Sequence, residues 1–205
     1  MKNYRLLFLI PLIAGCYTGT KVVASWKNPS ISKSYHSIFV ATLTSNTVSR
    51  STIETEMANA FSKRGLVTIK SIDEIPPTFK QDSTAKGQIL QKIREKGSEA
   101  ILTISLLKKE TESRYVSGGY APMSSYGYYS SFGGYYNYAY PGAYSPGYYE
   151  NEDVYYLETN LYDSQSELLI WSAQSKTESY ASLQSLAKEY AAVIVDQMFR
   201  ENVIK

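Results

Sequence analysis

Cysteine and histidine are almost absent from the sequence: 205 residues contain one of each, Cys16 and His36. A single cysteine excludes an intramolecular disulfide framework and any zinc site built from several cysteines. A single histidine excludes a histidine-rich metal site, and we expect no metal and no cofactor. With 43% hydrophobic and 20% charged residues, the composition is that of a globular protein.

Beyond the first fifteen residues, the sequence also has no excess of positive or negative charge. Lys2 and Arg5 are the only charged residues of that segment, and the remaining 190 residues carry 19 basic and 19 acidic side chains. A neutral chain has no global field to hold nucleic acid or an anionic membrane surface. Nucleic acid is therefore not expected as a partner.

The longest apolar run at the amino terminus, Leu6–Ile13, is too short to cross a bilayer, because a spanning helix needs about 20 apolar residues. It fits a secretory signal, and the small residues Ala14 and Gly15 follow where cleavage would occur. The run Leu12-Ile-Ala-Gly-Cys16 resembles the lipobox of bacterial lipoproteins, with isoleucine in place of the more usual leucine at position 13. We therefore predict a signal peptide over residues 1–15. The alternative is an ordinary signal peptide with an incidental cysteine.

The lipobox resemblance implies that Cys16 is the lipid attachment site, carrying diacylglycerol and a further acyl chain such as palmitate. Each buried CH₂ contributes about 0.8 kcal/mol, so two or more chains anchor a protein stably where one does not. Tyr17 follows the cysteine, and no aspartate stands there to suggest retention at the inner membrane. We expect a lipid-anchored protein of the outer membrane, facing the periplasm or the surface.

The rest of the chain alternates strands with helices. Residues 16–35 are expected to form a lipidated tether that could hold an edge strand. Strands are predicted at residues 37–42, 66–70, 100–114, 154–162 and 168–177, and helices at residues 51–64, 85–96 and 183–199. The first helix is predicted to begin with a capping box, Ser51 with Glu54, and to stop at Gly65 in the left-handed conformation.

This element order predicts one α/β domain with a mixed sheet, with α+β as the alternative class. Its core comprises residues 36–114 and 150–205.

Residues 115–149 interrupt this core with a tyrosine- and glycine-rich insert. The 35 residues include 12 tyrosines and no charged side chain. Tyrosine concentrates at recognition surfaces because it offers a flat apolar face and a hydroxyl with few rotatable bonds. The candidate binding residues are six tyrosines of this insert: Tyr126, Tyr128, Tyr129, Tyr135, Tyr136 and Tyr138. The alternative is a tolerated surface insertion without a binding role.

No catalytic motif is found. The sequence has no G-x-S-x-G elbow and no phosphate-binding loop, and we expect the protein not to be an enzyme. His36 is interpreted as a polar residue at the start of a strand. The carboxylates of Asp73, Glu74, Asp163 and Glu167, and those near residues 150–153, are interpreted as solvated loop groups.

Several short motifs together resemble a group of uncharacterised bacterial envelope lipoproteins. They are Trp26-Lys-Asn-Pro29, Arg50 with Glu54, Gly97-Ser-Glu-Ala100, Leu157–Asp163 and Leu169–Ala173. The element order is also similar to that of the amino-terminal domain of the periplasmic Tol-system protein and of lipoproteins that activate cell-wall synthases.

These likenesses imply a non-catalytic binding or assembly module of the cell envelope, whose partner is an envelope protein or a cell-wall glycan. The alternative is a structural or glycan-associated protein that contacts peptidoglycan or polysaccharide through the tyrosine-rich insert.

Overall fold

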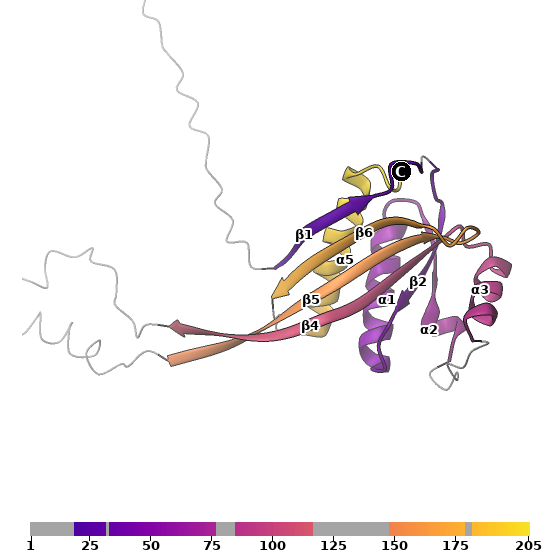
Figure 1. Cartoon of the computed structure of the whole chain (residues 1–205). Coiled ribbons are helices and arrows are strands. Elements are labelled where there is room, and N and C mark those ends of the chain that lie inside the picture. The colour runs from indigo at the N-terminus through magenta and orange to yellow at the C-terminus, as the bar shows by residue number, and fades with distance from the viewer. Residues whose placement is uncertain (1–18, 32, 77–84, 117–147, 179–181) are drawn as a thin grey trace, which may run out of the picture.

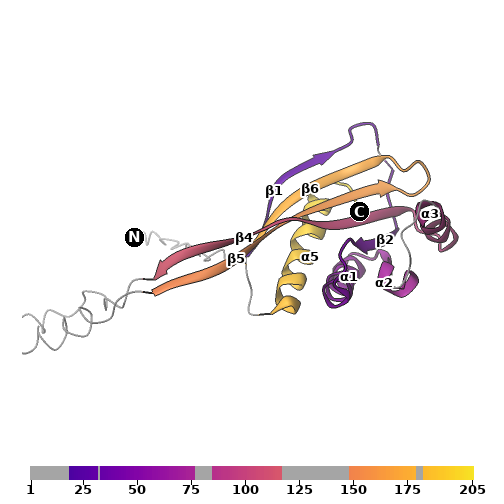
Figure 2. The ribbon, with the colours of Figure 1, turned by 60° about the horizontal axis from the view of Figure 1, so that its bottom comes forward.

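The computed structural model describes residues 19–31, 33–76, 85–116, 148–178 and 182–205. Within these ranges the chain forms a six-stranded sheet with helices on both of its faces (Figures 1 and 2). The elements follow the chain in the order β1 (Thr20–Lys27), β2 (Ser37–Thr42), α1 (Thr47–Ser62), β3 (Val67–Lys70), α2 (Ser71–Glu74), α3 (Ala85–Glu95), β4 (Ala100–Val116), β5 (Tyr148–Asp163), β6 (Leu169–Glu178) and α5 (Leu183–Arg200).

The sheet is mixed and has the strand order β1-β6-β5-β4-β2-β3. β2 lies parallel to both β3 and β4, whereas β4, β5, β6 and β1 pair antiparallel in turn. The predicted α/β class is therefore confirmed. The predicted edge strand is also present, since β1 lies at one edge of the sheet and pairs only with β6.

The main hydrophobic core lies between the sheet and two helices, α1 and α5, which pack side by side on one face (Figure 2). Alternation along the strands points every second residue toward these helices. In the central strand β4 these residues are Ala100, Leu102 and Ile104, all fully buried. Trp171 of β6 is also fully buried in this core.

A smaller core covers one end of the opposite face. Phe39 and Ile101 alternate with the residues of the main core, and they pack with Ile89, Leu90 and Ile93 of α3. Both faces of β2 and of the first part of β4 are therefore covered. This double burial explains why their sequences are continuously apolar rather than alternating.

Helix α1 begins four residues earlier than predicted, at Thr47. Its N-cap is Asn46, whose side-chain oxygen accepts a hydrogen bond from the Ser49 backbone N–H at 2.9 Å. The predicted capping box of Ser51 with Glu54 is therefore wrong. Both residues lie within the helix, where the backbone N–H groups of the first turn are no longer free.

The carboxylate of Glu54 is fully buried and connects three elements instead. It accepts hydrogen bonds from the Thr42 backbone N–H (2.9 Å), the Ser71 hydroxyl (2.6 Å) and the Ile72 backbone N–H (2.8 Å). The Arg50 guanidinium lies 3.4 Å from it and also donates to the Ser71 hydroxyl and the Ile75 carbonyl. This cluster ties α1 to the end of β2 and to α2.

The predicted stop at Gly65 is confirmed, and a second glycine ends α3 in the same conformation. Gly65 follows α1 with φ +77°, and Gly97 follows α3 with φ +75°. Behind Gly65, the Leu66 N–H donates to the Phe61 carbonyl at 3.2 Å, which closes the end of the helix and turns the chain into β3.

We expect Glu54→Ala to lower the free energy of unfolding by about 3–5 kcal/mol, because it leaves a largely buried guanidinium and two backbone N–H groups without their acceptor. Urea unfolding of the purified domain measures this loss. The matched control is Glu95→Ala, since Glu95 is an exposed glutamate in helix α3. A loss for Glu54→Ala no larger than that for the control would contradict the role of this cluster.

Candidate functional site

The β4–β5 hairpin continues beyond the sheet as a two-stranded arm. The last partner of β6 on β5 is Val154, which pairs with Glu178. For six further β4–β5 pairs, from Thr111↔Asp153 to Val116↔Tyr148, the described part of the chain provides no third strand. We call residues 111–116 and 148–153 the arm. Figures 1 and 2 show it projecting away from the helices and the rest of the sheet.

Polar side chains hold the two strands of the arm together. The Asp153 carboxylate pairs with Lys109 Nζ at 2.7 Å and accepts a hydrogen bond from the Thr111 hydroxyl at 3.0 Å. The hydrogen bond from Lys109 lowers the pKa of Asp153. Further out, the Ser113 hydroxyl donates to the Asn151 side chain at 2.6 Å. An isolated two-stranded ribbon is marginally stable in water, so these contacts reinforce the backbone ladder.

Aromatic side chains occupy the end of the arm. The rings of Tyr115 and Tyr149 lie directly opposite each other with their centroids 5.3 Å apart and a tilt of 60°. Tyr115, Tyr148 and Tyr149 are 55%, 60% and 73% exposed. The arm therefore presents three tyrosines to its surroundings at the point farthest from the core.

A bulge in β4 precedes the arm. The β4–β5 register shifts between Leu106 and Lys108, so Leu107 is the extra residue. Bulges bend a strand and re-aim the segment that follows. Just beyond the bulge, Lys108 Nζ lies 4.3 Å from the Tyr156 ring centroid and forms an ion pair with Glu110 at 2.7 Å. The hydrogen bond with this lysine lowers the pKa of Glu110.

Most of the predicted functional residues lie outside the described part of the chain. This applies to Cys16 and to the candidate tyrosines of the insert, namely Tyr126, Tyr128, Tyr129, Tyr135, Tyr136 and Tyr138. At each end of the predicted insert 115–149, two residues belong to the paired strands of the arm. The arm therefore holds the two ends of residues 117–147 next to each other.

His36 lies at the surface before β2. Its side chain is 79% exposed, and its Nδ1 is 3.7 Å from the Glu99 carboxylate. Glu99 also accepts a hydrogen bond from the His36 backbone N–H at 2.8 Å. The histidine does not line the groove described below.

Asp163 was interpreted from the sequence as a solvated loop carboxylate, and this interpretation is wrong. The residue is 8% exposed, because the turn between β5 and β6 folds around it. Its carboxylate accepts hydrogen bonds from the backbone N–H groups of Gln165 and Ser166, and it pairs with Lys33 Nζ at 3.1 Å. Burial alone would raise the pKa of Asp163, but these bonds outweigh it and hold the pKa at about 2.

Two of the short motifs on which the sequence resemblance rested make contacts within the fold. In Trp26-Lys-Asn-Pro29, Lys27 Nζ donates to the Glu201 and Asn202 carbonyls behind α5, and the Asn28 N–H donates to the Ile170 carbonyl. Trp171 Nε1 donates to the Glu201 carboxylate at 2.6 Å. These bonds connect β1 to β6 and connect the end of α5 to both strands. The residues of the two motifs therefore have a structural role.

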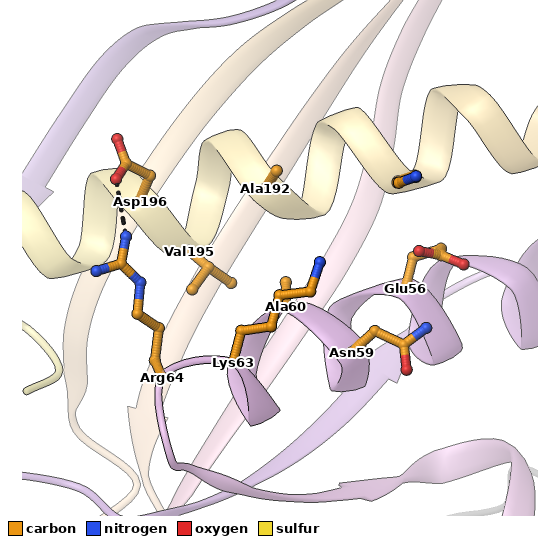
Figure 3. Close-up of a pocket in the computed structure, with 9 residues that line it drawn as sticks. Glu56, Asn59, Ala60, Lys63, Arg64, Ala192, Val195 and Asp196 are labelled. Carbon is orange, nitrogen blue, oxygen red and sulfur yellow. Dashed lines mark hydrogen bonds and ion pairs between the residues drawn. The ribbon is translucent and has the colours of Figure 1, made fainter.

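A shallow groove of about 180 Å³ lies between α1 and α5 (Figure 3). It is lined by Glu56, Asn59, Ala60, Lys63, Arg64, Lys188, Ala192, Val195 and Asp196. The Arg64 guanidinium spans its end, 3.1 Å from Asp196 and 4.2 Å from the centroid of the Phe199 ring. Its lining residues carry both signs of charge and include no serine, cysteine or histidine.

In the described ranges, no three His, Cys, Asp or Glu side chains are grouped in a way that could hold a metal ion. No helix in these same ranges has the length and apolarity needed to span a membrane.

No family model and no curated protein matches the sequence. Among solved structures, the chain is similar to the PelC dodecamer from Paraburkholderia phytofirmans, with 16% identity, a TM-score of 0.46 and coverage of 86% of this chain and 95% of that chain. It is also similar to lipoprotein GNA1162 from Neisseria meningitidis, with 17% identity, a TM-score of 0.40 and coverage of 80% and 98%. A structural likeness to a bacterial lipoprotein thus exists at low identity, whereas the likeness to the Tol-system domain stays a prediction.

We expect Asp163 to stabilise the fold in a pH-dependent way. Its pKa is lowered from 3.8 to about 2 in the folded chain, so its contribution is fully present above pH 4 and is lost as the pH falls toward 2. The shift corresponds to about 2 kcal/mol.

The measurement is urea unfolding of the parent and Asp163→Asn chains from pH 7 to pH 2.5. The stability gap between them should shrink as the pH falls. Asp73→Asn, which removes an exposed carboxylate, is the control. A gap that stays constant over this range would show that the Asp163 charge is not what stabilises the turn.

Proposed function

We propose that the chain is a non-catalytic lipoprotein of the outer membrane that acts as a binding or assembly module in the cell envelope. Cys16 is the anchor, the α/β core is the scaffold, and the arm with residues 117–147 makes the functional contacts. The partner is an envelope protein, with a cell-wall glycan as the alternative.

The observation that carries this proposal is the position of the arm. In the described residues no third strand pairs with its six outer β4–β5 pairs, yet they are maintained by specific side-chain bonds such as Lys109–Asp153 and Lys176–Glu112. Such an arm adds little to the core and exposes tyrosines at its end. Exposed aromatic groups on a defined scaffold are typical of recognition surfaces.

The core supports a scaffold role for a second reason. The buried carboxylates of Glu54 and Asp163 are both engaged by neighbouring donors within the fold. The groove between α1 and α5 is shallow, and Arg64 at its end is paired with Asp196. These features favour a protein that acts by contact over one that performs chemistry in a cavity.

We expect the loss of residues 117–147 to abolish partner capture without unfolding the protein. The variant replaces this segment with Asn-Gly, because a two-residue type I′ turn can join Val116 directly to Tyr148, its partner in the ladder. The photo-crosslinker p-benzoylphenylalanine replaces Tyr149 in both the full-length and the shortened chain, and adducts formed in living cells are identified by mass spectrometry.

The matched control places the crosslinker at Leu168, which is 57% exposed and lies in the turn between β5 and β6 at the other end of the strand pair. The proposal predicts a protein or glycan adduct from position 149 that disappears in the shortened chain. The same adduct from position 168, or its persistence after shortening, would assign the contact to the α/β core instead. Circular dichroism and thermal unfolding of the shortened chain check that the fold is retained.

A further inference from the structure

The arm and the amino terminus leave the sheet at the same end. β1 begins at Thr20, which pairs with Thr177 of β6, and Thr177 pairs with Tyr155 of β5. Tyr155 is two residues from the start of the arm. β1 and β5 both lie antiparallel to β6, so they run in the same direction and both start from this end (Figure 1).

Two lengths can be compared along the strand direction. The arm ends at Tyr148, seven residues beyond the level of Tyr155 and Thr20, which is about 23 Å at the rise of a β-strand. Cys16 is only four residues from Thr20, and four extended residues span at most about 14 Å. The arm therefore reaches farther than the segment that links β1 to the proposed lipid anchor.

An orientation in which the arm points away from the membrane is incompatible with the length of the link between Cys16 and Thr20. β1 runs from Thr20 to Lys27 in the direction away from the arm, which is again about 23 Å. If the arm pointed away from the membrane, this part of the sheet would have to pass into the bilayer to keep Cys16 at its surface. Because the link is short, either the arm end of the sheet faces the membrane or the sheet lies along the membrane surface.

From this geometry we infer that Tyr115, Tyr148 and Tyr149 form a second membrane contact, which inserts into the interface of the bilayer that holds the lipid anchor. The inference rests on the lipid anchor of the proposed function. It adds a partner for the end of the arm, namely the lipid headgroup region.

The chemistry of the three side chains fits this partner. Tyrosine is enriched at membrane–water interfaces because its ring is apolar and its hydroxyl remains hydrated. The three tyrosines are more than half exposed, and the rings of Tyr115 and Tyr149 contact each other at a tilt of 60° across the strands. The next pair toward the core is Arg114 opposite Glu150, and Glu112 lies opposite Glu152 two pairs further in. The tyrosines are therefore the outermost aromatic residues of the arm, with charged residues directly behind them.

The charges of the arm also specify the kind of membrane surface. The arm contains Arg114 and four carboxylate residues: Glu112, Glu150, Glu152 and Asp153. A net negative arm is repelled by an anionic surface, and this repulsion weakens with salt. A zwitterionic bilayer is therefore the appropriate probe.

The single thiol allows a direct test. The mature chain is coupled through Cys16 to a maleimide lipid in phosphatidylcholine vesicles that contain brominated phosphatidylcholine, which quenches tryptophan inside the bilayer. The probes are Tyr149→Trp and, separately, Tyr115→Trp. The matched control is Leu168→Trp, at the opposite end of the sheet. All three are made in a Trp26→Phe background, in which buried Trp171 supplies a constant signal.

We expect quenching at positions 149 and 115 to exceed that at position 168 by about threefold or more, with a shift of emission to shorter wavelength, because only the arm end enters the interface. Vesicles with a large share of anionic lipid should reduce the difference at low salt. Equal quenching at the three positions, or stronger quenching at position 168, would overturn the inference.

Failure of the membrane contact can be distinguished from failure of the proposed function. Mass spectrometry of the membrane-extracted native chain reports whether Cys16 carries lipid, and the captured adducts report whether residues 117–147 bind a partner. A lipidated chain whose arm end is not quenched would refute only the membrane contact. An unmodified Cys16 would refute the anchor itself.

Discussion

The backbone ladder between β4 and β5 is the pairing on which the other parts of the structure depend. Its inner section, from Ala100↔Asp163 to Leu106↔Leu157, lies at the centre of the sheet and carries the residues that pack against α1 and α5. Its outermost section, from Thr111↔Asp153 to Val116↔Tyr148, is the arm and has no residue in the buried core. One continuous ladder thus connects the rigid core to the most exposed part of the described chain. The position of Tyr149 consequently depends on the same strand pair that buries Leu161, with the register shift at Leu107 between the two.

Buried polar groups fix the elements around this ladder. Glu54 draws the end of β2 and the start of α2 to helix α1, and Glu201 accepts hydrogen bonds from Trp171 and Ser25 of two neighbouring strands. Glu54 is fully buried and Glu201 is partly buried. A carboxylate removed from water is costly without partners, so each of the two favours a single arrangement of its donors. Both glutamates are held by donors from several elements, which explains why short motifs scattered along the sequence are needed for one fold.

Apolar periodicity was enough to predict the order of the main strands and helices, because each element has one or two buried faces of sufficient length. The start of α1 could not be read in the same way. Ser51 and Glu54 match a capping box in spacing, but the signal is local, and the true partners of Glu54 are 12 to 18 residues away. Asp163 was misread for a different reason: its carboxylate is buried by its own turn, whose Gln165 and Ser166 N–H groups bind it, and only Lys33 comes from a distant part of the chain. Spacing along the chain does not report such contacts, whereas Asn46 before Thr47 was a cap signal that could have been used.

The extent of the arm was the largest feature that the sequence did not indicate. Lys108, Glu110 and Glu112 read as a polar continuation of the third strand, and only their pairing with residues 150–156 shows that the two strands stay together. Alternating charges at the edge of a ribbon protect it from pairing with other chains. The tyrosines beyond them have no such protection and no packing partner in the core. A functional contact at this end of the molecule can therefore change with little cost to the fold, whereas a change at Glu54 or Trp171 would act on stability first.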